Sequence, residues 1–124
     1  MTLFRHEIRN GIAWVTFDSG GMNTLSQAAV ADLRVVTAAI AEAHAQSALT
    51  GVVLRGNRFG LGAGANIGEL MGAERAQLAQ FIDLAHEALY AIEEGPLPWV
   101  AVVDGVALGG IYELALACRA IVAT

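Results

Sequence analysis

Hydrophobic and polar positions change their period several times along the chain, and each change predicts a new element. Near the N-terminus, two β-rich runs are joined by Asn10-Gly11. This pair favours a type I′ hairpin turn because both central residues of that turn need positive φ. A helical period follows Ser26, which can cap a helix over residues 26–46. The face expected to be buried comprises Ala29, Leu33, Val36, Ile40 and Ala43.

From residue 51 onward, short apolar runs bounded by glycine alternate with helical patterns. The predicted order is a strand (51–56), a glycine-rich loop (57–70), a helix (roughly 73–94), a strand (99–105), a helix (109–118) and a final strand (120–124). Strands that alternate with helices in this way predict an α/β fold with right-handed crossovers. The apolar face expected for the 73–94 helix comprises Leu78, Phe81, Ile82, Ala85, Leu89 and Ile92.

The composition is unusually apolar for a chain of this length. Hydrophobic residues make up 56% of the 124 residues and charged residues 15%, whereas about 25% charged residues are usual in soluble domains. A small domain buries a smaller fraction of its surface than a large one. We therefore expect the chain to form a homo-oligomer through an apolar interface, or to be part of a larger fold.

Charge and cysteine content narrow the class of protein further. The net charge is −5 with only 7 Lys and Arg residues, which argues against a nucleic-acid or anionic-membrane surface. No apolar run is long enough for a membrane helix, and the charged N-terminus does not resemble a secretion signal. Cys118 is the only cysteine, which excludes an internal disulfide and favours a cytoplasmic location.

Two glycine-bearing turns follow predicted strands and carry the candidate chemistry. In the first, Gly60, Gly62 and Ala65 satisfy the G-x-G-x-x-A dinucleotide pattern. That pattern should begin directly after a strand, but four residues, GNRF, intervene. The acidic residue that should end a second strand falls instead in a predicted helix, near Asp83. A tight turn that requires glycine is therefore favoured over a nicotinamide cofactor site.

The second turn, Gly109-Gly110, opens a helix, whose first N–H groups lack intrahelical partners. Gly110 is thus a candidate oxyanion donor. Glu113 lies one turn further, as an isolated charge in an apolar stretch. We expect apolar surroundings for its carboxylate, which would suit general acid/base work beside an oxyanion hole. The alternative is a simple carboxylate in the first turn of a helix. His6, His44 and His86 share no metal-ligand spacing, so we expect no metal site, and Cys118 is expected in the core.

Three stretches together resemble the crotonase, or enoyl-CoA hydratase/isomerase, superfamily. GVALGGIYELALACRAIVA (105–123) is similar to its glycine-rich signature with a glutamate, GAGANI (62–67) to its second hallmark, and NTLS (23–26) to the entry of its first helix. The resemblance covers essentially the whole chain. The chain departs from the usual motifs at Asn66, where the family usually has Asp, and at Ile111 and Tyr112, where it has smaller residues.

The resemblance implies an α/β fold of the ClpP/crotonase type, a spiral of ββα units. It implies that residues 1–124 form a partial domain, the N-terminal half, truncated after the first catalytic helix. The expected ligand is an acyl-CoA thioester, with coenzyme A as part of the substrate and no other cofactor. By motif position, the backbone N–H groups of Ala65 and Gly110 form an oxyanion hole and Glu113 is catalytic. Expected CoA contacts are Arg55, Arg58, Leu61 and Ala63.

Enoyl-CoA hydratase or isomerase chemistry through a thioester enolate is therefore the expected function, either alone or at the start of a multifunctional fatty-acid oxidation protein. Hydratases of the family use a second acid/base glutamate, which would fall beyond Thr124. The alternative is a catalytically impaired module that binds acyl-CoA or only assembles. A nicotinamide-dependent oxidoreductase is the third class, and it predicts NADH binding at residues 60–65.

Overall fold

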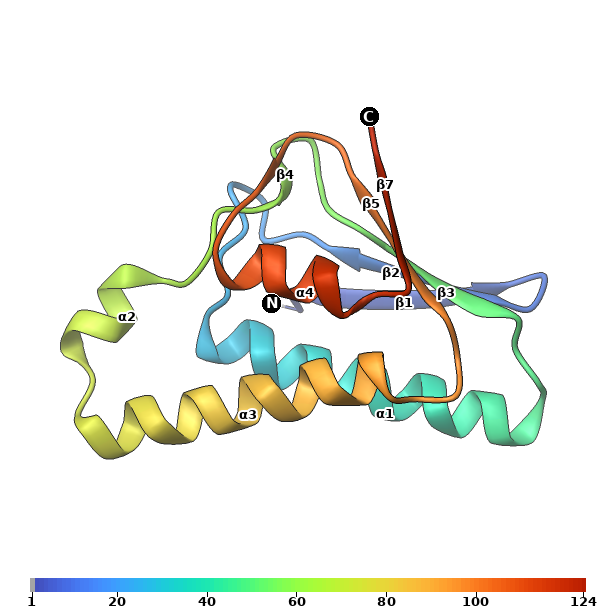
Figure 1. Cartoon of the computed structure of the whole chain (residues 1–124), viewed down its shortest axis with the longest axis horizontal. Helices are drawn as coiled ribbons and strands as arrows, with labels where there is room; N and C mark the ends of the chain where they lie inside the picture. Colours follow the sequence, from blue (N-terminus) through green and yellow to red (C-terminus); the bar gives the residue numbers. More distant parts are fainter. Residues whose placement is uncertain (1) are drawn as a thin grey trace.

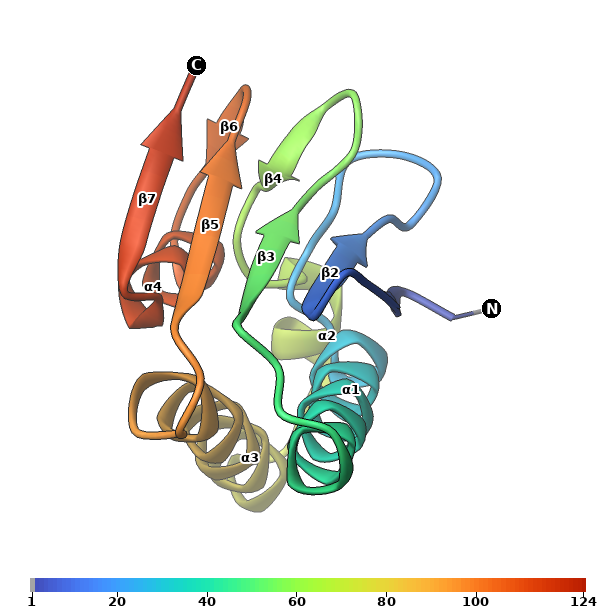
Figure 2. The same ribbon diagram turned by 90° about the vertical axis from the view of Figure 1, so that its right-hand side faces the viewer.

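The computed structural model describes residues 2–124, the side chain of Ile67 excepted. Its elements are β1 (Phe4–Arg9), β2 (Ile12–Phe17), α1 (Gln27–Gln46), β3 (Gly51–Arg55), β4 (Gly60–Gly62), α2 (Ile67–Gly72), α3 (Arg75–Glu93), β5 (Trp99–Val103), β6 (Val106–Ala107), α4 (Gly110–Ala117) and β7 (Ala120–Ala123). Five strands form the main sheet in the order β1-β2-β3-β5-β7. The β1–β2 pair is antiparallel and the other pairs are parallel, as Figure 2 shows for β2, β3, β5 and β7.

Local sequence signals account for the first three elements. Asn10 and Gly11 have φ of 53° and 78°, as the predicted I′ turn requires. The Ser26 side chain accepts a hydrogen bond of 3.1 Å from the Ala29 amide, and α1 begins at the next residue. The hairpin, the cap and the helix are therefore confirmed where the sequence predicts them.

Two long helices lie side by side against one face of the main sheet, where the core forms. Figure 1 shows α1 and α3 running together along this face, with α4 between α3 and the strands. Strand residues that alternate in sequence point into this layer, among them Val15, Phe17 and Leu54, all fully buried. The rings of Phe4 and Phe17 stack with centroids 4.1 Å apart, which fixes β1 over the same core.

The same order of secondary-structure elements follows β3 and β5. Each strand leads through a turn into a short strand, β4 or β6, and then into a helix. These are two ββα units, as the resemblance implies. The short strands pair with each other in parallel as a separate two-stranded sheet. The expectation of a glycine-rich loop over 57–70 is therefore wrong in part, because this stretch contains β4 and the start of α2.

The 73–94 helix is shorter than expected, and the face predicted to be apolar is buried or partly buried at every position except Ile82. It spans Arg75–Glu93, and the Gln77 side chain accepts a hydrogen bond from the Glu74 amide at its start. Its most buried residues are Ala88 and Ile92, while Ile82, expected on the apolar face, is 49% exposed. The Ile82 side chain therefore points away from the core. Within residues 2–124, no helix combines the length and apolarity needed to cross a membrane.

Candidate functional site

The pairing of β4 with β6 brings the two glycine-bearing turns together. In this parallel ladder Gly62 lies opposite Ala107. Ala65 follows Gly62 by three residues and Gly110 follows Ala107 by three residues, so turns of equal length lead from the paired strands to both amides. The Leu108 amide also donates a 3.1 Å hydrogen bond to the Gly62 carbonyl. Two positions 45 residues apart in the sequence thus leave the small sheet at the same level.

Both turns need glycine at the residue before the candidate amide. Gly64 has a φ of +103° and Gly109 a φ of +56°, in the region that side chains with a Cβ rarely adopt. A Cβ on Gly64 would lie 3.3 Å from the Leu108 carbonyl oxygen, and one on Gly109 would lie 3.4 Å from the Gly64 Cα. The two turns are therefore in direct backbone contact.

A hydrogen bond on the opposite side of its peptide unit sets the direction of the Ala65 N–H group. The Gly64 carbonyl accepts a 2.6 Å hydrogen bond from the Leu25 amide. Carbonyl and N–H of one trans peptide point in opposite directions, so the Ala65 N–H group points away from Leu25. It donates no hydrogen bond to any residue that the structure describes.

The direction of the Gly110 N–H group is fixed in the same way, by a hydrogen bond in the first turn of α4. The Gly109 carbonyl accepts a 3.1 Å hydrogen bond from the Glu113 amide, so the Gly110 N–H group points out of the helix start. The next two amides, of Ile111 and Tyr112, both donate to the Leu108 carbonyl. Among residues 2–124, the Gly110 amide has no acceptor. Two donors without partners thus stand at neighbouring turns.

Glu113 lies on the exposed side of α4, so the sequence-based expectation of an apolar setting is wrong. The helix buries Ile111, Leu114 and Ala115 against the core, while Glu113 is exposed. The carboxylate opens onto a groove of about 290 Å³ between α3 and α4. The other residues that line this groove are His86, Leu89, Tyr90, Glu93, Leu116 and Ala117.

The four predicted CoA contacts differ in what they can offer a ligand. The Arg58 side chain is exposed and lies over the Phe59 ring at 4.7 Å. The Arg55 guanidinium is engaged, because its Nε donates a 3.1 Å hydrogen bond to Thr16 and it also lies over Trp14. Leu61 is fully buried, so only its backbone remains for a ligand. Ala63 is exposed, but its amide already donates to the Asn23 carbonyl at 2.8 Å.

Close packing explains the glycines that fit the dinucleotide pattern. A Cβ on Gly60 would clash with the backbone of Val106, and one on Gly62 would lie 2.8 Å from the Ile111 side chain. Both residues belong to β4 and neither opens a helix. Their position differs from that of a phosphate-binding turn, which lies at a helix N-terminus.

The remaining titratable candidates have local explanations. His6 is exposed on β1, and the His44 Nδ1 atom accepts a hydrogen bond from the Leu49 amide. Cys118 is buried, and its thiol donates to the Leu114 carbonyl. Burial raises the pKa of this thiol to about 12, so Cys118 is a core residue as predicted. The described residues contain no cluster of three metal-ligating side chains.

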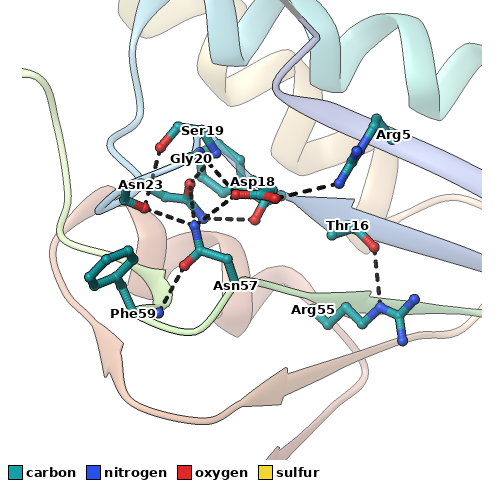
Figure 3. A network of polar contacts seen from close by, with 11 residues as sticks. Arg5, Thr16, Asp18, Ser19, Gly20, Asn23, Arg55, Asn57 and Phe59 are labelled. Atoms are coloured by element: carbon teal, nitrogen blue, oxygen red, sulfur yellow. Dashed lines mark hydrogen bonds and ion pairs between the residues drawn. The ribbon is translucent and has the colours of Figure 1, made fainter.

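Sequence reasoning missed a polar network beneath the first turn (Figure 3). Asn23 is fully buried, and its side chain donates to the carbonyls of Phe17 and Leu61 at 2.8 and 3.1 Å. Asn57 donates to Asp18 at 3.0 Å and to the Gly21 carbonyl at 2.8 Å. The available signal was one asparagine in each of two glycine-containing loops, DSGGMN and GNRFG, since buried amides in loops satisfy backbone groups.

Comparisons with known proteins agree with this architecture. The chain is 32% identical to a Streptomyces coelicolor A3(2) protein described provisionally as an enoyl-CoA hydratase, with a TM-score of 0.84; the match covers 98% of this chain and 45% of that one. It is 25% identical to an enoyl-CoA hydratase from Bacillus anthracis, with a TM-score of 0.87 and coverage of 98% and 47%. It is 26% identical to Pseudomonas aeruginosa AtuE, with a TM-score of 0.88 and coverage of 98% and 48%.

The chain thus spans about half the length of these solved structures. The sequence model of the family described as "Enoyl-CoA hydratase/isomerase" matches residues 7–124. This match includes both ββα units and both turns that carry the free amides. The chain belongs to the enoyl-CoA hydratase/isomerase family.

Proposed function

We propose that this protein binds an acyl-CoA thioester and stabilises its enolate through the amides of Ala65 and Gly110. The observation that carries the proposal is the pair of N–H groups at adjoining turns that have no acceptor among the described residues, each fixed by a hydrogen bond on the far side of its peptide. Donors held in place before the reaction stabilise a developing oxyanion because they need no reorganisation. No other cofactor enters the proposal.

Glu113 is the proposed acid/base group, one helical turn from Gly110. In a hydration, it would take a proton from water as the oxygen bonds to C3 of a 2-enoyl thioester, and the charge would move to the thioester oxygen; a proton would then have to be delivered to C2 as the enolate collapses. In an isomerisation, it would remove a proton beside the carbonyl and return it two carbons further along the dienolate. One carboxylate suffices for the second reaction, because the same group removes and returns the proton.

The CoA portion is proposed to lie along residues 58–63, in front of the first free amide. Arg58 is the best placed cation because its guanidinium is exposed and contacts only the Phe59 ring among the interactions described. Leu61 and Ala63 would contribute backbone shape rather than side-chain contacts. Arginine binds phosphate oxygens well because its planar fork offers several donors.

Turnover of crotonyl-CoA and of a 3-enoyl-CoA by the wild type and by Glu113→Gln tests the catalytic part. Glu93→Gln is the matched control, because Glu93 lines the same groove from α3. Loss of a general acid/base group should lower turnover about 100-fold or more. Equal rates in the wild type and Glu113→Gln would contradict a catalytic Glu113. Binding of crotonyl-CoA without turnover would leave a thioester-binding module.

Self-association belongs to the same proposal. The edge strand β7 is exposed along its length, with Ile121 40% and Val122 51% exposed, and Leu116 on α4 is 56% exposed. Burying such side chains between copies would be favourable at about 25 cal/mol per Å². A monomeric native mass by light scattering would contradict it. A cytoplasmic location is also proposed, since Cys118 is a free buried thiol.

A further inference from the structure

Among the residues that the structure describes, Asn23 is the most deeply buried polar side chain, and it makes three short hydrogen bonds. Its Nδ2 atom donates to the carbonyls of Phe17 and Leu61. Its Oδ1 atom accepts from the Ser19 amide at 2.8 Å, and the side-chain nitrogen of Asn57 lies 3.4 Å from it. An asparagine amide has two donor and two acceptor positions; here both donor positions and at least one acceptor position are used.

The segment that contains Asn23 runs beside the residues that lead to the Ala65 amide. The Asn23 side chain holds the Leu61 carbonyl, the Asn23 carbonyl accepts from the Ala63 amide at 2.8 Å, and two residues later Leu25 donates to Gly64. Leu25 and Ala65 then form a parallel bridge. Residues 23–25 therefore hold residues 61–65 in place through backbone hydrogen bonds, and we call residues 23–25 the backbone rail.

The side chain of Asn23 is what ties this rail to the sheet. Its bond to Phe17 anchors the rail to the end of β2, and its bond to Leu61 anchors it to β4. Without these bonds, the rail would be held to β4 only through its own backbone contacts. The direction of the Ala65 N–H group depends on the rail, because Leu25 fixes the carbonyl of the same peptide.

We propose that Asn23 is a positioning residue for the Ala65 half of the oxyanion hole. The inference rests on the proposed function, and it adds a residue that contacts neither the thioester nor the CoA. Asn23 acts through Leu25 and Gly64, so its loss should change how strongly a bound carbonyl is polarised. Affinity for CoA itself, which lacks the thioester carbonyl, should stay near the wild-type value.

Two measurements on the whole chain test this inference. The first is the ¹³C chemical shift of crotonyl-CoA labelled at the thioester carbonyl, free and bound. The second is amide hydrogen exchange of Ala63, compared with the amides of β3. Asn23→Ala is the test variant, and Asn23→Ser is a milder one, because a hydroxyl has a single donor and cannot hold Phe17 and Leu61 together.

Ser26→Ala is the matched control. Ser26 is buried in the same segment and caps α1 through the Ala29 amide, but it makes no hydrogen bond to residues 61–65 among those described. Losing a cap destabilises a protein about as much as losing a buried hydrogen bond. The control therefore separates a general loss of stability from a change at Ala65.

We expect the wild type and Ser26→Ala to shift the bound carbonyl downfield equally, and both Asn23 variants to lose most of that shift. Exchange at Ala63 should rise about tenfold in the Asn23 variants, the factor expected for one lost hydrogen bond. A full carbonyl shift in both Asn23 variants would overturn the inference and leave the proposed function intact. A carbonyl that does not shift in the wild type would overturn both.

Discussion

Gly109 lies against Gly64, with the Gly64 Cα only 3.4 Å from the place where a Cβ on Gly109 would stand. This contact joins the strand-to-helix turn of one ββα unit to the same turn of the other. Each glycine also has a positive φ. The neighbouring amides of Ala65 and Gly110 are thus held at a distance that depends on the absence of two side chains.

Replacing Gly109 with alanine should therefore destabilise the fold. A positive φ at a residue with a Cβ costs about 1–3 kcal/mol, and we expect a loss of this size in urea unfolding. Gly72→Ala is the control, since a Cβ on Gly72 meets nothing within 4 Å. Such a surface change should stay within about 0.5 kcal/mol. Equal unfolding midpoints for the two variants would contradict the assignment of strain to Gly109.

The two arginines near the first turn should differ in their effect on CoA binding. Arg58→Gln should weaken binding about twofold to fivefold, as expected for one exposed ion pair. Arg55→Gln should weaken it less, because the Arg55 side chain is already engaged by Thr16 and Trp14. Titration calorimetry with CoA at low and high salt measures both. A larger loss for Arg55→Gln would place the CoA phosphates nearer to the end of β3 than to Arg58.

Asp18 should make stability depend on pH in the acid range. The Asn57 side chain, followed by the Gly20 amide, lowers the pKa of Asp18 below its ordinary value of 3.8. The ionised carboxylate therefore favours the folded state above pH 3.8, and this contribution disappears as pH falls through the lowered pKa. The difference in unfolding midpoint between the wild type and Asp18→Asn should be largest near neutral pH and shrink below 3.8. A difference that does not change with pH would refute the coupling.

Cys118 should be inert until the protein unfolds. Burial raises the pKa of its thiol to about 12, and alkylating agents react with the thiolate. At pH 8, iodoacetamide should modify the chain in urea and leave the folded chain unmodified, as mass spectrometry can determine. Rapid modification of the folded chain would mean that the C-terminal end of α4 opens readily.

Local signals were enough to predict most of the main sheet and its helices. The Asn10-Gly11 turn, the Ser26 cap and the apolar runs of β3 and β5 each act within a few residues. They need no knowledge of distant segments. The parallel order of the strands follows from the alternation of strand and helix.

The short strands and the buried network were beyond such reasoning. Gly60–Gly62 has too few side chains for any periodicity, and it is a strand only because Val106–Ala107 lies beside it. Asn23 likewise gains its importance from Leu61 and Asn57, more than 30 residues away. The exposure of Glu113 was missed because an apolar stretch of sequence was taken for apolar surroundings, whereas α4 has one buried and one open face.

The parallel pairing of β4 with β6 also sets a rule for the lengths of the two turns. Gly62 and Ala107 are partners, and the same number of residues leads from each to its free amide. A single-residue insertion after Gly62 would carry the Ala65 amide past that of Gly110, and a single insertion after Ala107 would do the reverse. An insertion or deletion in one turn should therefore keep the two amides level only when the other turn changes by the same number of residues. The two turns, far apart in the sequence, are thus expected to vary in length together.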